Sequence, residues 1–322
     1  CTGPGCPDID AYVPTLVLSG APSMGGILVP ALVEAFGARY GLTSERKIES
    51  DRRFTYDLTD AEDDRVAARF IFQLSSSDEA FADLLAGVAD VALSAREIRA
   101  DELDRAIEAG LGDLSASQRA RVLALDAIVP IAGTASPLRT VSFEDLAAVF
   151  SGVPLDWTGQ EEDRVPARLH LLPPATGTTQ AFMARIMEPS EAKLSEEVVF
   201  HDDAEALADA VAADPLAVGI APYSELGNAQ VLGLSGSCGY ATWPSDEGLR
   251  TEDFPLTAPL FIYTPARRFP AVVRDFLAFA QSPAAAIVVR RAGFVDQRPS
   301  TIPMGEQGLR LANAIRGAGQ GV

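Results

Sequence analysis

The chain has 322 residues, of which 48% are hydrophobic and 22% are charged, a composition that allows two globular domains with substantial cores. Its formal net charge of −19 at pH 7 argues against nucleic-acid binding, because a phosphate backbone requires clustered Lys and Arg and the sequence shows no such run. There is also no stretch of about 20 apolar residues, so the sequence predicts no transmembrane segment.

Residues 1–13 are predicted to be an N-terminal linker. The chain begins at Cys1 without a methionine, which is typical of a mature form or an excised fragment, and lipidation of Cys1 is an alternative. The three cysteines are an odd number for an oxidising compartment, and we expect one disulfide, joining Cys6 either to Cys1 or to Cys238. Their scatter indicates no zinc site, and no metal or other cofactor is expected.

The segment from Leu16 to Phe36 predicts a strand, a tight loop and a helix. An apolar run ends at Gly20, and apolar residues resume at helical spacing from Ile27. Ser23 and the amide of Met24 are placed at the start of this helix, where uncovered N–H groups and the helix dipole favour an anion. The alternative is that Ser23 only caps the helix.

The same pattern recurs further along the chain. In the charged segment from Arg46 to Arg65, the portion DLTDAEDDR is too polar for a core and is predicted to be a solvated loop without chemistry. The next strand, Ala68 to Leu74, is followed by a serine-rich helix start. Ser94 and Arg96 lie just beyond the carboxyl end of the next strand. Because the carboxyl ends of parallel strands share one edge of a sheet, these junctions are expected to form one ligand-binding edge. Its candidate residues are Ser76, Ser77, Ser94 and Arg96.

In the second half, Arg121 to Ala132 is a long apolar strand of the kind that crosses between lobes. A strand from Leu169 to Leu172 leads into a turn of small residues and then a helix. This turn is a second candidate anion site, made of Thr176, Gly177, Thr178 and Thr179. The histidines, His170 and His201, are interpreted as a packed strand residue and a neighbour of a helix cap rather than as catalytic or metal-binding groups.

The order of the motifs is more specific than any one of them. Six occur in sequence: SGAPSMGG, FQLSSSDEAF, LALDAIVPIAG, ATGTTQAF, DPLAVGIAPYSEL and PLTAPLFIYTP. In this order they resemble the phosphate-binding solute receptors of ATP-driven importers, over roughly residues 14–298. The resemblance implies an α/β periplasmic-binding-protein fold of type II, with two lobes, mixed sheets flanked by helices and a two-strand hinge.

The resemblance also implies domain boundaries and a site. The first lobe would comprise 14–125 and 226–298, the second 126–225, and 299–322 would be a C-terminal tail or linker. Matched by position, the residues expected to hold ligand oxygens are Ser23, the Met24 amide, Ser77, Thr176, Gly177 and Thr178. The implied function is an extracytoplasmic or periplasmic binding protein that traps phosphate or a similar oxyanion between the lobes, with an ATP-driven permease as partner.

Two positions depart from the family's pattern. Ala95 stands where these receptors place an aspartate that accepts a proton from phosphate, and Leu172 stands where they place a clamping arginine. Arg96 is a candidate substitute for the missing positive charge. The alternative is that Arg96 pairs with Glu97 or Glu102.

No motif predicts an enzyme: GxSxG, HExxH, P-loop and GxGxxG patterns are absent from the sequence. The alternative function is a non-transport sensor or interaction module of the cell envelope that has lost strict phosphate binding. The tail GLRLANAIRGAGQGV, which resembles the beginning of an extension, favours this alternative, with a further peptidoglycan-binding domain as the expected continuation.

Overall fold

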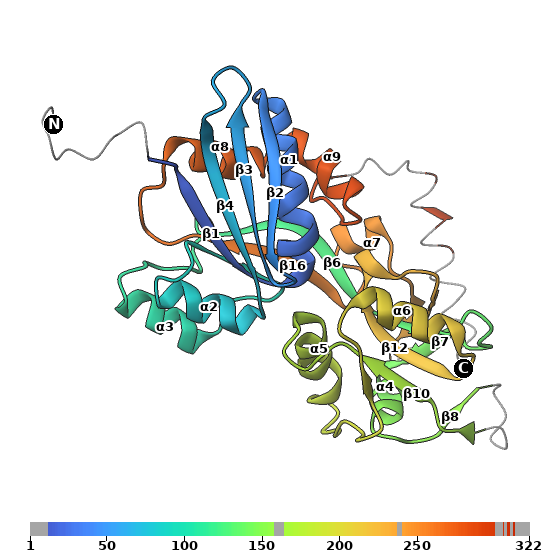
Figure 1. Ribbon diagram of the computed structural model, residues 1–322. Coiled ribbons are helices and arrows are strands. Elements are labelled where there is room, and N and C mark those ends of the chain that lie inside the picture. The colour runs from blue at the N-terminus through green and yellow to red at the C-terminus, as the bar shows by residue number, and fades with distance from the viewer. Residues whose placement is uncertain are drawn as a thin grey trace, which may run out of the picture. The chain divides into compact units, whose positions relative to one another are not determined.

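The computed structural model describes residues 12–157, 164–236 and 240–299, with isolated positions beyond 299. The contacts divide the chain into two units (Figure 1). Unit 1 contains residues 12–123 and Leu260–Ala292, and unit 2 contains Ala124–Pro259 and the described residues from Gly293 onward. The cysteines of the expected disulfide, Cys1, Cys6 and Cys238, all lie outside the described residues.

The unit boundaries differ from the predicted lobe boundaries mainly in the segment 226–259, and residues 293–298, also predicted for the first lobe, belong to unit 2 as well. The segment 226–259 was assigned to the first lobe, but it belongs to unit 2. Its apolar side chains explain the difference, because they are buried in the core of unit 2, where each is at most 1% exposed: Leu232, Leu234, Leu249, Phe254 and Leu256. The chain therefore passes from unit 2 back to unit 1 within β16 (Thr257–Tyr263) and not near residue 226.

Unit 1 is built on a mixed sheet with the strand order β16-β5-β1-β4-β3-β2. Strand β1 is parallel to both of its neighbours, β4 and β5, whereas β16 is antiparallel to β5. The bounds are β1 Thr15–Gly20, β2 Leu42–Ser50, β3 Arg53–Asp60, β4 Val66–Leu74 and β5 Val91–Ser94. The helices are η2 Ser23–Leu28, α1 Val29–Arg39, α2 Ser77–Leu85, α3 Ala100–Glu108, α8 Ala271–Phe279 and α9 Pro283–Arg291.

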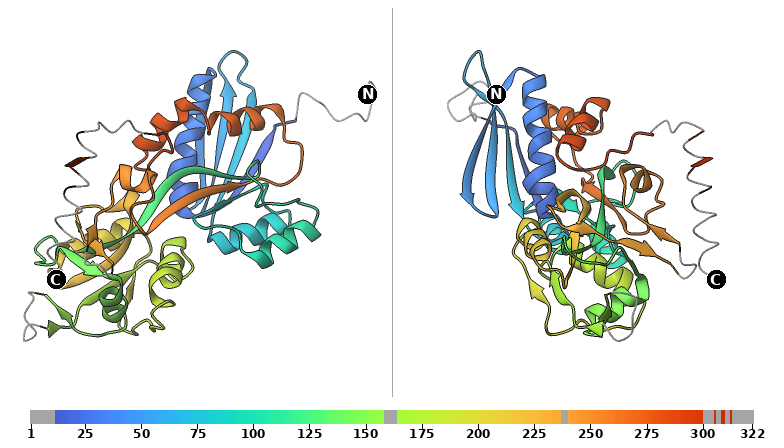
Figure 2. Two further views of the ribbon diagram at one scale, coloured as in Figure 1. Left: turned by 180° about the vertical axis from the view of Figure 1, so that it is seen from behind. Right: turned by 90° about the vertical axis from the view of Figure 1, so that its right-hand side faces the viewer.

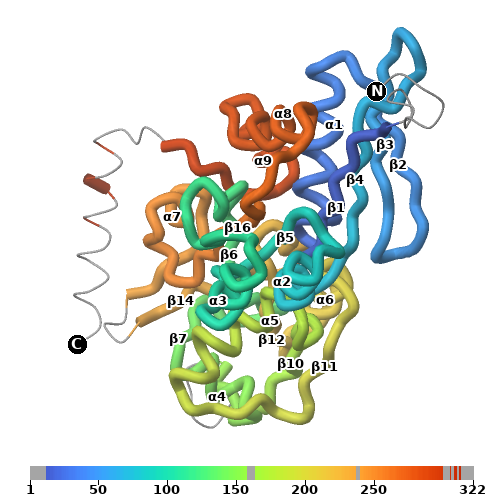
Figure 3. The backbone as a smooth tube through the Cα atoms, turned by 90° about the vertical axis from the view of Figure 1, so that its left-hand side faces the viewer, coloured from blue at the N-terminus to red at the C-terminus, as the bar shows by residue number. Residues whose placement is uncertain are grey.

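Aromatic side chains hold the helices of unit 1 to its sheet. The helices α1, α8 and α9 cover one face, as the blue and red ribbons of Figure 2 show. There the ring of Phe276 lies 5.7 Å from that of Phe36 and 4.9 Å from that of Phe70. Helix α2 packs against β1 and β5, and α3 packs against α2 (Figure 3). The strands and helices thus follow the apolar periodicity of the sequence.

The prediction of a solvated loop over DLTDAEDDR, residues 57–65, is wrong for 57–60, which belong to β3, and agrees with the exposed turn at 61–65. Strands β2 and β3 form an antiparallel hairpin, and β3 also pairs with β4. The signal was the alternation of Phe54, Tyr56 and Leu58, each at most 3% exposed, which the surrounding charges obscured. One of those charges, Asp57, is itself buried: Arg69 donates to its two oxygens at 2.6 and 3.0 Å.

The Asp57 contacts predict an acid sensitivity of unit 1. The hydrogen bond from Arg69 lowers the pKa of Asp57 below 3.8, so its contribution to stability is complete above that pH and is lost as the pH falls below it. Asp57→Asn is expected to lower the free energy of unfolding at pH 7 by roughly 1 to 3 kcal/mol and to flatten its decline in acid. Urea unfolding between pH 3 and 7 measures both effects. Equal acid slopes for the two proteins would contradict this role of Asp57.

Unit 2 has a second sheet, in which the strand order is β11-β10-β12-β6, with β13 also paired to β6. Strand β10 is parallel to both neighbours, whereas β6 is antiparallel to β12. The bounds are β6 Ala120–Ala132, which begins in unit 1, β10 Arg168–Leu171, β11 Val199–Phe200, β12 Ala217–Pro222 and β13 Gln230–Val231. Short strand pairings complete the unit: β7 Thr140–Ser142 with β14 Gly233–Ser235 and β15 Ala241–Thr242, and β8 Leu155–Asp156 with β9 Arg164–Val165.

The α-helices of unit 2 begin at polar caps. The Ser142 hydroxyl accepts from the Asp145 amide at 2.9 Å, and the Asp203 carboxylate accepts from the Ala206 amide at 2.8 Å. In the core, the rings of Phe150 and Phe182 meet edge to face at 4.8 Å. The helices are α4 Phe143–Phe150, α5 Gly177–Phe182, η4 Met183–Met187, α6 Ala204–Ala213, η5 Tyr223–Glu225 and α7 Asp246–Arg250.

Within the described part of the chain, no single helix has the length and apolar character needed to cross a membrane. Only α8 and α9 taken together pass such a test, and they are bent by 69° at the break between them. Buried side chains of both helices, including Val273, Phe276 and Val289, belong to the interior.

Candidate functional site

Three of the predicted ligand-binding segments lie at one edge of the unit 1 sheet. Ser23 follows β1, Ser77 follows β4, and Arg96 follows β5, and these three strands are parallel neighbours. The close approach of β1 and β5 at this edge requires glycine: Gly20 has a φ of +144°, and a Cβ there would lie 1.9 Å from the carbonyl oxygen of Leu93. The predicted sharing of one edge is therefore confirmed for unit 1.

Ser23 is the first residue of η2, which packs against β4 and β5. Pro22 occupies the N-cap position and makes no side-chain cap, so the interpretation of Ser23 as the helix cap is wrong. Within the described chain, the half-buried Ser23 hydroxyl has no hydrogen-bond partner. Met24, by contrast, has no exposed surface, so its amide is shielded from solvent in this conformation.

The two serines at the start of α2 have different roles. Ser76 is the N-cap of a capping box: its hydroxyl accepts from the Glu79 amide at 3.1 Å, and the Glu79 carboxylate accepts from the Ser76 amide. Ser77 is fully buried, and its hydroxyl accepts from the Ala95 amide at 3.2 Å. This contact joins the start of α2 to the end of β5, so Ser76 stabilises the helix while Ser77 connects two of the predicted ligand-binding segments.

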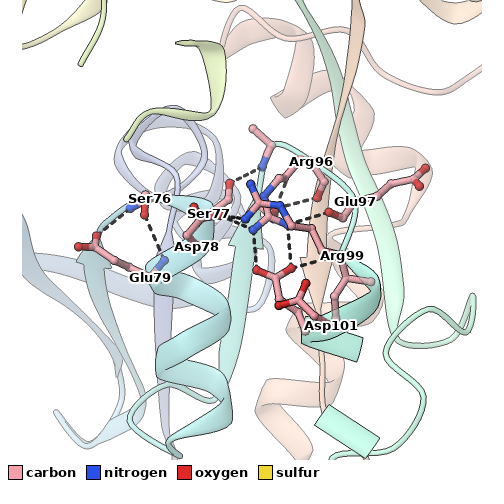
Figure 4. A network of polar contacts seen from close by, with 12 residues as sticks. Ser76, Ser77, Asp78, Glu79, Arg96, Glu97, Arg99 and Asp101 are labelled. Atoms are coloured by element: carbon pink, nitrogen blue, oxygen red, sulfur yellow. Dashed lines mark hydrogen bonds and ion pairs between the residues drawn. The ribbon is translucent and has the colours of Figure 1, made fainter. Parts of the chain in front are cut away.

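Arg96 is engaged by carboxylates on two helices (Figure 4). Its two terminal nitrogens donate to the Glu102 oxygens at 2.9 and 2.7 Å, and one of them also donates to Asp78. Burial alone would lower the pKa of Arg96, but the hydrogen bonds to Glu102 and Asp78 outweigh it and raise the pKa. The guanidinium carbon lies 5.1 Å from the centre of the Phe81 ring. The alternative interpretation, in which Arg96 pairs with a nearby glutamate, therefore holds in the structure. The partner is Glu102, and Asp78 is an additional one.

The loop carrying Arg96 is held by its own serine. The Ser94 hydroxyl donates to the carbonyl oxygen of Arg96 at 2.7 Å and accepts from the Arg96 amide at 3.2 Å. Ser94 is fully buried. It positions the backbone of Arg96, so its hydroxyl is occupied within the loop.

In unit 2 the predicted turn forms the start of α5, directly after β10. Thr176 is the N-cap: its hydroxyl donates to the carbonyl oxygen of Pro173 at 2.8 Å and accepts from the Thr179 amide at 3.4 Å. The buried Thr179 hydroxyl donates to the carbonyl oxygen of Leu172 at 2.7 Å. No partner among the described residues contacts the Thr178 hydroxyl or the amides of Gly177 and Thr178. These three donors are available to an anion at a helix start.

Ala95 and Leu172, the two positions that depart from the family pattern, contribute no polar side chain. Leu172 is 7% exposed and lies in the core of unit 2. Ala95 contributes only its amide, which Ser77 already accepts. Neither position offers the carboxylate or the guanidinium that the resemblance implies at it.

A buried acidic group in unit 2 was not identified from the sequence. Asp126 on β6 accepts from the Ser224 amide and hydroxyl at 3.0 and 2.7 Å, and burial raises its pKa. Burial, reinforced by the charges of Asp126, Asp203 and Glu205, raises the pKa of Glu225 to about 7. Glu225 follows β12 and Asp203 follows β11, at the same edge of the unit 2 sheet as Thr176, since β10, β11 and β12 are parallel.

The histidine pair was also not identified. The Nδ1 atom of His170 lies 2.8 Å from the Nε2 atom of His201, and the rings are stacked. Burial and the neighbouring His201 lower the pKa of His170. Within 12–157, 164–236 and 240–299 there is no group of three or more His, Cys, Asp or Glu residues placed to hold a metal ion. His170 is 9% exposed, in agreement with its expected packing role.

Comparisons with known proteins agree with this architecture. A family model described as a PBP superfamily domain matches residues 13–284. No curated protein sequence matches the chain.

Among solved structures, an ABC-type phosphate transport receptor from Vibrio cholerae is 16% identical, with a TM-score of 0.63 over 87% of this chain and 99% of that one. A putative phosphate ABC transporter substrate-binding protein from Clostridium perfringens, solved with bound phosphate, is 17% identical, with a TM-score of 0.61 over 88% and 100%. A possible phosphate-binding protein from Planctomyces limnophilus is 14% identical, with a TM-score of 0.58 over 95% and 99%. At these identities the likeness establishes the fold.

Proposed function

The chain belongs to the PBP superfamily, and from that premise we propose that it is an extracytoplasmic solute-binding protein for a small oxyanion, phosphate or a close relative. The observation that carries the proposal is the set of three free donors at the start of α5: the Gly177 amide, the Thr178 amide and the Thr178 hydroxyl, none of which has a partner in the described chain. Hydrogen bonds from such donors to a charged oxygen are stronger than those between neutral groups.

Unit 1 has candidate donors of its own. The Ser23 hydroxyl is half-buried and has no partner in the described chain, whereas the Ser77 hydroxyl, like the Met24 amide, is fully buried in this conformation. Arg96 is excluded from this set, because Glu102 and Asp78 already neutralise its charge. Binding would therefore rest on hydroxyls and amides, and the ligand would keep its charge without a guanidinium counterion.

Calorimetric titration with phosphate, sulfate and a phosphonate tests this function. We expect at least one of these anions to bind with a dissociation constant below 1 mM, which corresponds to more than about 4 kcal/mol of binding free energy. If none binds in this range, the proposal fails. Ala95 offers no carboxylate to accept a hydrogen bond from a protonated oxyanion, so binding should not require a protonated form of the anion.

Thr178→Ala is expected to weaken binding of the anion by about 1 to 3 kcal/mol, roughly 5- to 150-fold, because one ligand oxygen loses its donor. Thr140→Ala is the matched control, since Thr140 is exposed in the same unit and its side chain has no partner in the described chain. Its affinity should equal that of the unmodified protein. An unchanged affinity in Thr178→Ala would remove this hydroxyl from the site.

One alternative function has structural support. The pairing of Arg96 and the burial of Leu172 leave both candidate positions without a free positive charge, which favours a cell-envelope sensor or interaction module that no longer requires phosphate. The transport function requires an ATP-driven permease as partner, whereas the alternative predicts contact with an envelope component such as peptidoglycan. Sedimentation with isolated peptidoglycan, together with the calorimetry above, distinguishes them.

A further inference from the structure

A pocket rich in arginine lies on unit 1, away from the candidate oxyanion residues. It has a volume of about 390 Å³ and is formed by the first residues of β6 and those just before it, the segment that follows β16, and one side of α8. Hydrogen bonds join the chain before β6 to the segment after β16: the Thr264 amide donates to the carbonyl oxygen of Arg119 at 3.0 Å, and the Ala266 amide donates to that of Leu111 at 2.7 Å.

The sheet topology separates this pocket from the candidate site in the same unit. Strand β16 is antiparallel to β5, and Tyr263 at its carboxyl end pairs with Ala92 near the start of β5. The pocket therefore lies at the amino end of β5, whereas Ser23, Ser77 and Arg96 lie at the carboxyl ends of the parallel strands. The two groups of residues therefore lie at opposite ends of the strands of one sheet.

The charge of this pocket is opposite in sign to the net charge of the chain. Four arginines line it, Arg119, Arg121, Arg267 and Arg274, and its lining contains no Asp or Glu, in a chain that carries 45 acidic and 26 basic residues. Arg267 forms an ion pair with Asp90. The side chains of the other three form no hydrogen bond or ion pair with any described residue, and Arg119 affects Asp113 only through its charge. Gathered like charges repel one another unless an anion lies between them.

The pocket also has an apolar wall. Phe269 is buried beneath the Arg267 guanidinium, whose carbon lies 4.8 Å from the ring centre, and the mostly buried Leu277 contributes from α8. The volume falls within the range of pockets that hold small organic ligands, roughly 300 to 1,000 Å³, and is larger than an inorganic oxyanion needs. A ligand that contacts both the arginines and this apolar wall therefore needs an anionic group and an apolar body.

We propose that this arginine pocket, defined by Arg119, Arg121, Arg267 and Arg274, is a second binding site, for a small organic anion such as a phosphate ester with an apolar body. The anionic group pairs with the unpartnered guanidiniums, and the apolar body contacts Phe269 and Leu277. This site is independent of the oxyanion site proposed above, because it shares no residue with it.

The test is calorimetric titration of the full chain with phenyl phosphate. The double variant Arg119→Gln/Arg274→Gln is compared with Arg268→Gln/Arg291→Gln, which removes the same two charges from exposed positions outside the pocket lining. We expect the unmodified protein to bind phenyl phosphate, the pocket variant to bind it at least about tenfold more weakly, and the control variant to bind it within about twofold of the unmodified protein. Benzyl alcohol, which lacks the anion, should not bind.

Thr178→Ala separates this proposal from the proposed function. Phenyl phosphate binding that survives Thr178→Ala but is weakened by the arginine substitutions supports the pocket, even if inorganic phosphate fails to bind at all. Binding that is lost in Thr178→Ala and unchanged in the pocket variant overturns it, as does the absence of any binding or an equal loss in both arginine variants. Arg121→Gln alone provides the same comparison if the double variant does not show the thermal unfolding transition of the parent.

Discussion

Arg96→Met is expected to lower the free energy of unfolding by about 3 to 5 kcal/mol while leaving oxyanion affinity unchanged. The Arg96 side chain is 16% exposed and that of its partner Glu102 is 6% exposed, so the substitution leaves a buried carboxylate without a counterion. Burying an unpaired charge is far more costly than losing an ion pair in solvent. Methionine keeps much of the length of the side chain and its contact with Phe81, so the effect reports on the charge.

Two further variants make this result specific. Arg105→Met removes an exposed ion pair with Asp101 in the same unit, where the side chains are 59% and 69% exposed, and should cost at most about 1 kcal/mol. The double variant Arg96→Met/Glu102→Gln should be more stable than Arg96→Met, because it no longer buries an unpaired charge. Urea unfolding measures all three. A stable Arg96→Met protein that fails to bind oxyanions would instead make Arg96 a ligand-binding residue.

Glu225→Gln is expected to stabilise the protein at pH 8 by about 3 kcal/mol. Burial and the charges of Asp126, Asp203 and Glu205 raise the pKa of Glu225 from 4.5 to about 7, so the folded state holds its proton more tightly than the unfolded state. The stabilising effect of this proton is therefore complete below pH 4.5 and is lost as the pH rises through 7. Glutamine resembles the protonated side chain at every pH.

Denaturant unfolding of both proteins between pH 5 and 8 checks this prediction. The stability of the unmodified protein should fall over this range, and that of Glu225→Gln should fall less. Glu196→Gln, at an exposed position of unit 2, is the control and should follow the unmodified protein. Parallel curves for Glu225→Gln and the unmodified protein would show that Glu225 titrates alike in the folded and unfolded states.

The position of Glu225 connects this titration to the proposed function. Glu225 and the start of α5 lie at the same edge of the unit 2 sheet. An ionised Glu225 adds negative charge at that edge, whereas the protonated side chain does not. We therefore expect oxyanion affinity to decrease as the pH rises through 7, and this decrease to be smaller in Glu225→Gln.

Local sequence patterns identified the strand ends and helix starts at which the candidate site residues lie. Capping hydroxyls and apolar periodicity act within one or two turns of chain, so the helix start at Thr176 and the strand-to-helix junctions at Ser23 and Ser77 could be identified from neighbouring residues alone. The order of these junctions also indicated the superfamily. Where the local pattern was mixed, as in the alternation of Phe54, Tyr56 and Leu58 among charges, the strand was missed.

The sequence by itself therefore determined the fold class and the segments that carry the candidate ligand donors. Only the tertiary structure decided which charged side chains have an ion-pair or hydrogen-bond partner. Arg96 meets Asp78 from 18 residues away, His170 meets His201 from 31 residues away, and β16 and α8 bring Arg267 and Arg274 beside Arg119. The physical reason is that caps and periodicity depend on neighbours along the chain, whereas the partner of a long charged side chain depends on how the strands pair and the helices pack.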